Sequence, residues 1–377
     1  MHERSVGIAT ASFVPHDGVG RARDLDVERV ASSASARSRI LDCLAEHGAL
    51  GGQGQVFSRD PWHVLWGPGR KSFVPFLERR FSLLAWRDPV GPRDCQFLLL
   101  RNLLEHAKAR GKHVCVLGAS SRLAAQVEDL GYGAVWMGAE QELALPSFHL
   151  RGKQGAKLRL AINHARTMHC HARELFPLSS PADAQAIAAV EAAWKAPRKA
   201  LQTDSFLRTA PLEYAELRRY FGVETHGPDQ DASLQTLVVC SPVSRRAAYL
   251  QDFLRRPEAP RGAMEMAAVA AFEGLRRDGV SSATMGIVPF FGPSHAESIG
   301  FTGRLAQQCI RRFVYRFEGL QQFRAKFTAS RVEPVYALHY PRSVSLLAIW
   351  DLVTSLAPRA NQAKRTKPAG QGVTEPA

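Results

Sequence analysis

One segment of the chain combines a carboxylate with several arginines near the end of a strand-like run. Asp252 lies in the apolar stretch 247–254, Arg255 follows three residues later, and a helical pattern begins at residue 263. The first turn of a helix leaves backbone N–H groups free and its dipole favours anions, so a turn between a strand and a helix can bind phosphate. A carboxylate beside such a turn could act as a general base or could orient an acceptor hydroxyl or amine. The candidate phosphate-binding residues of the turn are Arg255, Arg256, Arg261 and Gly262.

Two simpler interpretations of this segment stay open. The turn could be an ordinary connection between a strand and a helix, and Asp252 could form a local salt bridge with Arg255. The turn also lacks the glycine spacing by which acetyltransferases grip coenzyme A, because Pro257 and Pro260 stand in it. Since Pro260 also restricts the backbone of the residue before it, we do not expect this turn to bind coenzyme A.

A second segment, residues 151–173, is rich in cations and contains no acidic residue. Leu158, Ile162, Ala165 and Met168 recur at helical spacing, which predicts one long helix over about 153–171 with these four on its buried side. A solvated helix face usually pairs its cations with Glu or Asp. The pattern therefore favours contact with a phosphate backbone over a merely solvated face. Its main cations are Arg151, Lys153, Lys157, Arg159, Arg166 and Arg173.

A third segment, residues 313–340, interleaves aromatic side chains with cations. Aromatic faces beside guanidinium groups suit an unpaired nucleotide end, where stacking and charge act together. The alternative is that the rings belong to the core and the cations to its rim. Arg324 and Lys326 lie two apart in a segment that we expect to be extended, so both would project to one face. Together with Arg316 they are candidate substrate contacts.

The elements that would position these residues alternate between strands and helices. Short apolar runs predict strands at 82–86, 113–117, 236–240, 247–253 and 282–287, and helical patterns occur at 95–110, 122–130, 182–194 and 263–278. The order repeats, which predicts an α/β (α+β) fold with two similar domains joined by the basic helix. We expect a flexible arm at 1–36, a first domain with the connecting helix at 37–172, a second, catalytic domain at 173–357 and a disordered basic tail at 358–377.

Composition narrows the classes of partner. A chain of 377 residues is long enough for two domains, and a net charge of +14 favours RNA or an anionic membrane surface as a partner. The six cysteines are scattered without a CxxC pair, and His169 and His171 would point to different faces of a helix, so we expect neither disulfides nor a metal. We see no signal peptide and no apolar run of about 20 residues. We expect a cytoplasmic protein that meets a membrane at most peripherally, at its inner face.

Taken together, these segments resemble the soluble catalytic region of the lysyl- and alanyl-phosphatidylglycerol synthase family, over about residues 56–341. Residues 88–92 (DPVGP) resemble the family's GDPVGP turn, with Arg87 in place of its first glycine. Residues 137–140 (MGAE) stand where the family has Gly-Glu-Glu-Ala. Residues 148–165 are similar to its F-x-L-x-G-K…L-R…N-x-A signature, which adds Asn163 to the basic set.

The second half carries further matches. Residues 252–255 (DFLR) resemble the family's Asp-Leu-Met-Arg motif, and residues 257–265 resemble its P-x-A-P-x-G-x-M-E run, which adds Glu265. Residues 285–289 (MGIVP) match the next strand. Residues 315–327 follow the pattern Y-x-F-x-G-L-x-x-F-K-x-K-F, with Arg324 in place of its first lysine. Each motif is weak alone, but their order and spacing are specific together.

The resemblance implies two tandem acetyltransferase-like (GNAT-like) domains that move an amino acid from aminoacyl-tRNA to a hydroxyl or amine, without a metal or a bound cofactor. It implies catalytic roles for Asp252, Arg255 and Lys326. Substrate contacts would come from Arg256, Arg261, Gly262, Glu265, Arg324 and Arg316, and tRNA contacts from Lys153, Lys157, Arg159, Asn163 and Arg166. The expected acceptor is an anionic phospholipid, phosphatidylglycerol first, or a small molecule.

Other functions remain as alternatives. The membrane flippase half of the family's best-known members is not in this sequence, so a soluble transferase that acts on a natural-product intermediate is the first alternative. An acyl-CoA-dependent N-acetyltransferase is the second. An RNA-binding module without catalysis is the third, and it would not need Asp252 or Arg255. The sequence does not indicate which amino acid is transferred.

Overall fold

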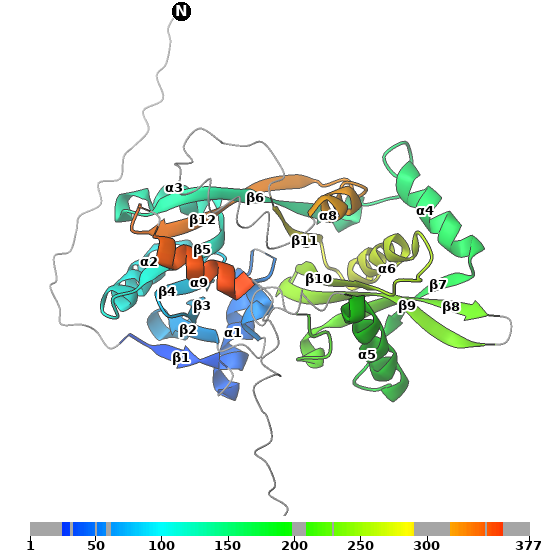
Figure 1. Cartoon of the computed structure of the whole chain (residues 1–377), viewed down its shortest axis with the longest axis horizontal. Helices are drawn as coiled ribbons and strands as arrows, with labels where there is room; N and C mark the ends of the chain where they lie inside the picture. Colours follow the sequence, from blue (N-terminus) through cyan, green and yellow to red (C-terminus); the bar gives the residue numbers. More distant parts are fainter. Residues whose placement is uncertain are drawn as a thin grey trace, which may run out of the picture.

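The computed structural model of the chain is built on one continuous 12-stranded sheet (Figure 1). It describes residues 25–30, 33–49, 51–57, 62–197, 209–227, 230–289, 317–343 and 345–356. The strands lie in the order β1-β2-β3-β4-β5-β12-β6-β11-β10-β9-β8-β7. Arg316, most of the predicted arm and the predicted tail 358–377 lie outside the described residues.

The strands are β1 (Val27–Arg29), β2 (Trp62–Trp66), β3 (Phe73–Glu78), β4 (Ser82–Trp86), β5 (His113–Ser120), β6 (Gly133–Ala144), β7 (Cys170–Leu175), β8 (Arg219–Gly227), β9 (Gln230–Ser244), β10 (Ala247–Arg255), β11 (Ser282–Pro289) and β12 (Arg331–Tyr340). The helices are α1 (Ala34–His47), α2 (Arg93–Lys108), α3 (Ser121–Gln126), α4 (Ala156–Thr167), α5 (Pro181–Lys195), α6 (Ala263–Arg277), α8 (Phe317–Arg324) and α9 (Leu346–Leu356). Strand β1 and the start of α1 fall inside the segment predicted as an arm. They are ordered because β1 pairs with β2 and the Ser33 side chain caps α1.

Each half of the sheet contains one parallel strand pair linked by a helix. Strands β4 and β5 run parallel with α2 between them in sequence, and β10 and β11 run parallel with α6 between them. The halves meet where β6 pairs with β11. A mixed α/β sheet with the same strand–helix–strand connection in both halves agrees with the alternation predicted from the sequence.

The last strand of the chain completes the first half of the sheet. Strand β12 lies between β5 and β6 and is antiparallel to both. Helix α9 follows it, and Leu352 of α9 joins the core of the first half. The C-terminal segment 331–356, which we assigned to the second domain, thus contributes to the sheet of the first half. The domain boundaries themselves stay a prediction.

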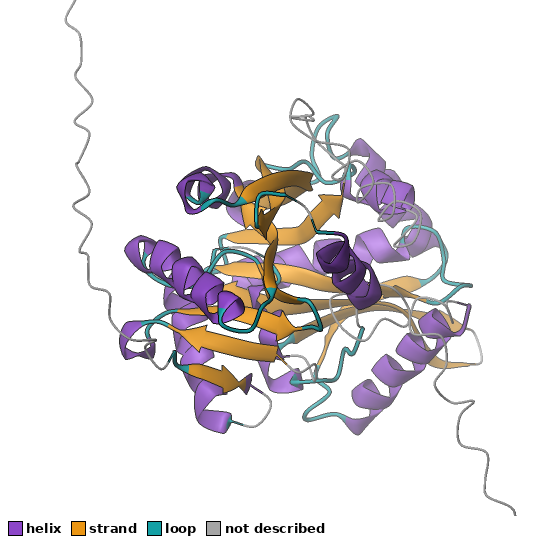
Figure 2. Ribbon diagram, turned by 60° about the vertical axis from the view of Figure 1, so that its left-hand side comes forward, coloured by secondary structure: helices purple, strands orange, loops and turns teal. Residues whose placement is uncertain are grey.

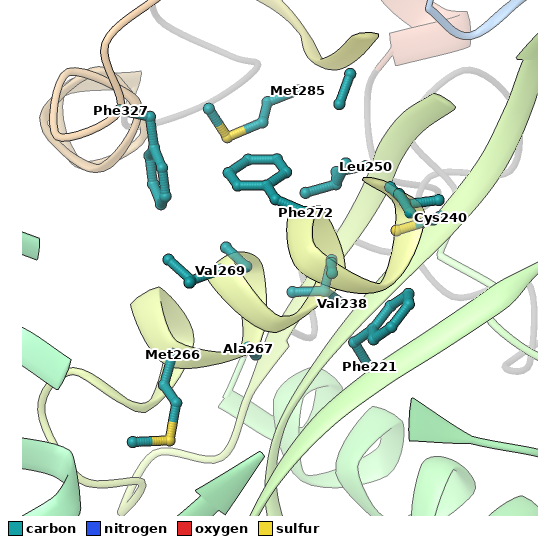
Figure 3. Packing of buried hydrophobic residues seen from close by; sticks show 14 of the residues in the cluster. Phe221, Val238, Cys240, Leu250, Met266, Ala267, Val269, Phe272, Met285 and Phe327 are labelled. Carbon is teal, nitrogen blue, oxygen red and sulfur yellow. The ribbon is translucent and has the colours of Figure 1, made fainter. Parts of the chain in front are cut away.

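Helices cover both faces of the sheet (Figure 2). Leu84 packs in the core with residues of α1 and α9, whereas its neighbour Leu83 faces the core with α2. In the second half Val239 faces α5 and Val238 faces α6, because successive strand residues point to opposite faces. Phe272 of α6 lies at the centre of the second core (Figure 3).

The basic helix is shorter than predicted. Helix α4 spans Ala156–Thr167 rather than about 153–171. It ends because His169 adopts a left-handed backbone with φ 54° and β7 begins at Cys170. Leu158, Ile162 and Ala165 form its buried side as predicted, but Met168 is 51% exposed, because it lies beyond the helix. Within the described part of the chain, no helix is both long and apolar enough to cross a membrane.

Candidate active site

The parallel strands β10 and β11 separate partway along their length. Their recorded pairing covers three positions, from Ala247 opposite Ser282 to Tyr249 opposite Thr284. Both strands then lose register with their outer neighbours: β10 has an irregularity against β9 just after Leu250, and β11 has one against β6 just after Thr284. Backbone groups of strands that stop pairing can bind a ligand instead. We call residues 250–255 of β10 together with residues 285–289 of β11 the strand split.

A bulge in β10 aims Asp252 at α5. In a regular strand Asp252 would share a face with Leu250, which packs in the core under α6. The register shift instead sets Asp252 opposite Val239, whose side chain packs in the core with α5. One extra residue, Gln251, therefore moves the carboxylate to the other face of the sheet.

Asp252 is buried with one of its oxygens unpaired. The residue is 8% exposed, and its Oδ2 has no hydrogen-bond partner among the described residues. Burial raises the pKa of Asp252 to about 6, while Arg218 lowers it, Glu191 raises it and Lys195 lowers it. A carboxylate with this pKa is ionised at neutral pH and still basic enough to accept a proton from an attacking group. Asp252 therefore has the properties of a general base.

Two arginines of the predicted phosphate turn stabilise it by donating hydrogen bonds to backbone carbonyls. The Arg255 Nη2 donates to the Ala259 carbonyl at 2.5 Å, and the Arg256 Nε donates to the Leu234 carbonyl at 2.7 Å. Arg255 is nevertheless exposed, so part of its guanidinium remains accessible to an anion.

Asp252 and Arg255 lie on opposite faces of the sheet. Arg255 stands opposite Thr236 in β9, and the Thr236 hydroxyl donates to the Ala263 carbonyl of α6. Arg255 is therefore on the α6 side, whereas Asp252 is on the α5 side. The structure records the Arg255 bond to a backbone carbonyl and no ion pair with Asp252, so the local salt bridge left open by the sequence is not formed among the described residues.

Gly262 brings the phosphate turn into contact with the basic helix. It has φ 88°, and a Cβ at this position would lie 1.8 Å from the Ala161 carbonyl oxygen of α4. The His164 Nδ1 donates to the Arg261 carbonyl at 3.2 Å. The two segments that the sequence assigned separately to phosphate and to RNA thus form one surface.

The predicted tRNA-binding residues lie on that surface. Arg159 braces the turn before α4 through the Leu150 and Gly152 carbonyls, and Arg166 donates to the Asn163 side chain at 3.3 Å. All five predicted residues are exposed: Lys153, Lys157, Arg159, Asn163 and Arg166.

Lys326 pairs with Glu265. Its Nζ lies 2.5 Å from the Glu265 Oε1 and 5.9 Å from the centre of the Phe323 ring. The Glu265 side chain is 8% exposed and that of Lys326 is 35% exposed. Two residues predicted for the site are thus brought together on the α6 side, where each neutralises the other.

Arg324 is a buried residue, in contrast to our expectation. It ends α8 and is 6% exposed, and its Nη1 donates to the carbonyls of Gly286 and Ile287 at 3.1 and 2.7 Å. Burial lowers the pKa of Arg324 to about 10, although Tyr249 raises it. The prediction that Arg324 and Lys326 project together from an extended segment is wrong, because the helix directs Arg324 to the edge of β11.

A buried ion pair next to the strand split was not assigned from the sequence. Arg87 is 1% exposed, and its Nη1 lies 3.0 Å from the Glu140 Oε2. The Glu140 Oε1 accepts from the Thr284 hydroxyl at 2.8 Å and from the Gly51 N–H at 3.1 Å. The Nε atoms of Arg87 and Arg324 have no partner among the described residues.

The sequence marks Arg87 as unusual, since the turn that it resembles has glycine at this position, but it does not indicate Glu140 as the partner. Arg87 has φ 66°, a conformation that favours glycine. An arginine at a position where the family's turn has glycine is therefore unfavourable for the backbone. The ion pair with Glu140 is a contact that glycine could not make.

Comparison with known proteins gives one family. Residues 44–339 match the family described as "Phosphatidylglycerol lysyltransferase, C-terminal". The chain is 24% identical over 340 residues to a phosphatidylglycerol lysyltransferase of Bacillus subtilis (strain 168). That alignment covers 88% of the chain and 37% of the relative, so the chain spans little more than a third of the relative's length.

Solved structures share the fold. The crystal structure of a C-terminal DUF2156 domain from Agrobacterium fabrum has a TM-score of 0.72 at 22% identity, over 87% of this chain and 99% of that one. L-PGS from Bacillus licheniformis has a TM-score of 0.70 at 19% identity, over 85% and 97%. FemX has a TM-score of 0.52 at 9% identity, over 84% and 98%.

Proposed function

Because the chain belongs to the phosphatidylglycerol lysyltransferase C-terminal family, we propose that it transfers an amino acid from aminoacyl-tRNA to the headgroup of phosphatidylglycerol or a related lipid. Family membership supports transferase activity for the chain. The Bacillus subtilis relative is named for lysyl transfer to phosphatidylglycerol. Because this chain spans little more than a third of that relative, we carry its substrates over to the chain only as a proposal.

The observation that carries the proposal is the buried Asp252 in the strand split. The ester that joins an amino acid to tRNA is already activated, so the enzyme mainly has to position an acceptor and take its proton. An acceptor hydroxyl would attack the ester carbonyl while its proton passes to Asp252. The new ester bond forms, the bond to the ribose oxygen breaks, and that oxygen leaves with a proton returned from Asp252.

The surface of α4 and the phosphate turn supports tRNA as the donor. Exposed cations of α4 adjoin the N-terminus of α6 through the contacts at Gly262 and His164. A tRNA backbone bound along α4 would bring its 3′ end to a turn that can hold a phosphate, with Arg255 exposed beside it. The aminoacyl-tRNA end would then lie on the α6 side of the sheet and Asp252 on the α5 side. The donor ester and the carboxylate would approach each other through the strand split, where β10 and β11 no longer pair.

The contacts of the remaining predicted residues suggest a role for each. Arg256, Arg261 and Gly262 shape the turn. Lys326 and Glu265 would orient the tRNA terminus on the α6 side as a neutral pair, and Arg324 would keep β11 away from β10. We also propose that each half is a GNAT-like domain, since each contains the same strand–helix–strand connection. The protein would work where charged tRNA meets the inner face of the membrane.

A comparison of donors tests this function. The purified chain is incubated with phosphatidylglycerol and either acetyl-CoA or a mixture of aminoacyl-tRNAs, with and without ribonuclease. We expect a product only with intact aminoacyl-tRNA, because the turn lacks a coenzyme A grip. Acetyl transfer to the lipid or to an amine added to the mixture, or a product that still forms after ribonuclease treatment, would exclude the proposed donor.

A further inference from the structure

Helix α9 turns two of its polar residues toward the protein. Asp351 is 4% exposed, and its carboxylate accepts from the Phe81 N–H at 2.7 Å and from the Ser82 hydroxyl at 2.8 Å. Ser355 is 5% exposed and accepts from the Arg79 Nε at 2.9 Å. A helix on the surface of a sheet normally buries an apolar stripe and exposes a polar one. Helix α9 buries Leu352 in the core, but it also buries these two polar side chains and exposes large apolar ones.

The outward side of α9 carries large apolar side chains. Leu346 is 64% exposed, Leu347 49% and Trp350 63%. Leu346 and Trp350 are one turn apart and point away from Ser355, and Leu347 lies between them and the side that carries Asp351, so the three form one exposed stripe. The helix lies over β4 and β5 at the surface of the molecule (Figure 1, red). We call Leu346, Leu347 and Trp350 the α9 stripe.

Arginines flank both ends of this helix. Arg342 precedes it, with a side chain that is 62% exposed and pairs with the exposed Glu128 at 2.9 Å. At the other end Arg79 contacts Ser355, and its neighbour Arg80 is exposed. Exposed leucine and tryptophan with arginines at the ends of the helix are typical of helices that lie in the interface of a bilayer, where the indole ring sits at headgroup level. Anionic headgroups would attract the arginines and the net charge of +14.

We propose that the α9 stripe docks the protein on bilayers that contain anionic phospholipid. The charge around the helix favours this occupant over a neutral surface. A second copy of the chain fits less well, since three side chains make a small patch beside the roughly 800 Å² per partner of a standard protein interface. The choice of a lipid surface rests in part on the proposed function, because an enzyme that modifies a lipid headgroup must reach the membrane.

Vesicle binding tests the docking surface without any catalytic step. The full chain is sedimented with vesicles of phosphatidylglycerol and phosphatidylcholine, or of phosphatidylcholine alone, in the absence of tRNA. The triple variant Leu346→Ser, Leu347→Ser, Trp350→Ser should bind the anionic vesicles at least about tenfold more weakly, because it loses the apolar area that enters the interface. Trp350→Phe should retain most of the binding. The matched control is Phe176→Ser with Leu178→Ser, which removes two side chains that are 57% and 71% exposed elsewhere.

Four outcomes would overturn the docking surface. They are wild-type binding by the triple variant, an equal loss in the control, equal binding to neutral vesicles, and a wild-type dimer that the triple variant converts to a monomer. Activity on a short-chain phosphatidylglycerol dissolved as monomers separates this proposal from the proposed function. The triple variant should keep that activity and lose activity on vesicles. A wild-type chain inactive on both forms that still binds anionic vesicles through α9 would refute the function and leave the docking surface standing.

Discussion

Replacing Asp252 with asparagine should slow transfer strongly without weakening the fold. Asparagine keeps the shape of the side chain and removes its charge and basicity. Loss of a general base costs about 10²–10⁴ in rate. Because α4 and the phosphate turn are untouched, tRNA affinity should stay within about twofold.

The stability of the same variant follows from the raised pKa. Burial raises the pKa of Asp252 from 3.8 to about 6. Between about pH 4 and pH 6 the folded protein retains a proton that the unfolded chain has released, so stability falls as the pH rises through this window. By neutral pH the free energy of unfolding is lower than at acidic pH by on the order of 3 kcal/mol from this group. Asp252→Asn does not ionise, so its Tm at pH 7.5 should equal or exceed that of the wild type.

The pH dependence of the wild-type rate gives a second measurement. Ionised Asp252 is the active form, so kcat should rise with pH around a midpoint near 6 and reach a plateau, with about a tenth of the plateau at pH 5.

Asp183→Asn is a matched control in the same half. Burial raises the pKa of Asp183, but the hydrogen bonds from Arg173, Phe176 and Ser180 outweigh it, so its net pKa lies below the usual value. This variant should lower Tm and retain most of kcat. An active Asp252→Asn variant, or one that is inactive only because it unfolds, would refute the assignment of the base.

Three further substitutions test the surroundings of the site. Arg324→Ala leaves the Gly286 and Ile287 carbonyls without their donor and should cost about 2–4 kcal/mol in urea unfolding; an unchanged midpoint would show that the guanidinium does not brace β11. Gly262→Ala should destabilise by about 2 kcal/mol or more, because its Cβ would strike the Ala161 carbonyl, whereas Gly279→Ala has a similar φ and open space and should cost only about 1 kcal/mol. Lys153→Ala with Lys157→Ala should weaken tRNA binding and reduce the log–log salt slope by about 1.4–1.8, and an equal effect from the exposed Arg101→Ala on α2 would argue against an α4 site.

Local pattern was enough to predict the elements that carry the site. The apolar runs at 82–86 and 247–253 and the helical pattern at 263–278 correspond to β4, β10 and α6 within a few residues. These elements are specified by alternation, by helical spacing and by glycine turns, all of which are visible in a short window of sequence. The same is true of the exposed cations before and along α4.

What the sequence did not predict depends on contacts between distant residues. One bulge at Gln251 decides which face Asp252 occupies, and no residue type near it marks the bulge. The insertion of β12 between β5 and β6 pairs segments that lie far apart in the sequence, and such a pairing carries no local signal. Arg324 was taken for an accessible cation because burial depends on where α8 packs. Arg87 became interpretable only when Glu140, 53 residues away, was found beside it.

The most direct measurement of the central claim follows a labelled amino acid from tRNA to lipid. Aminoacyl-tRNAs, each carrying one labelled amino acid, are mixed with the chain and phosphatidylglycerol vesicles, and label is counted in the organic and aqueous phases. We predict that at least one amino acid enters the organic phase as an aminoacyl lipid, at a rate that Asp252→Asn reduces at least about 100-fold. Label that enters only a water-soluble product, or no product with any aminoacyl-tRNA, would contradict the lipid acceptor or the transfer reaction itself.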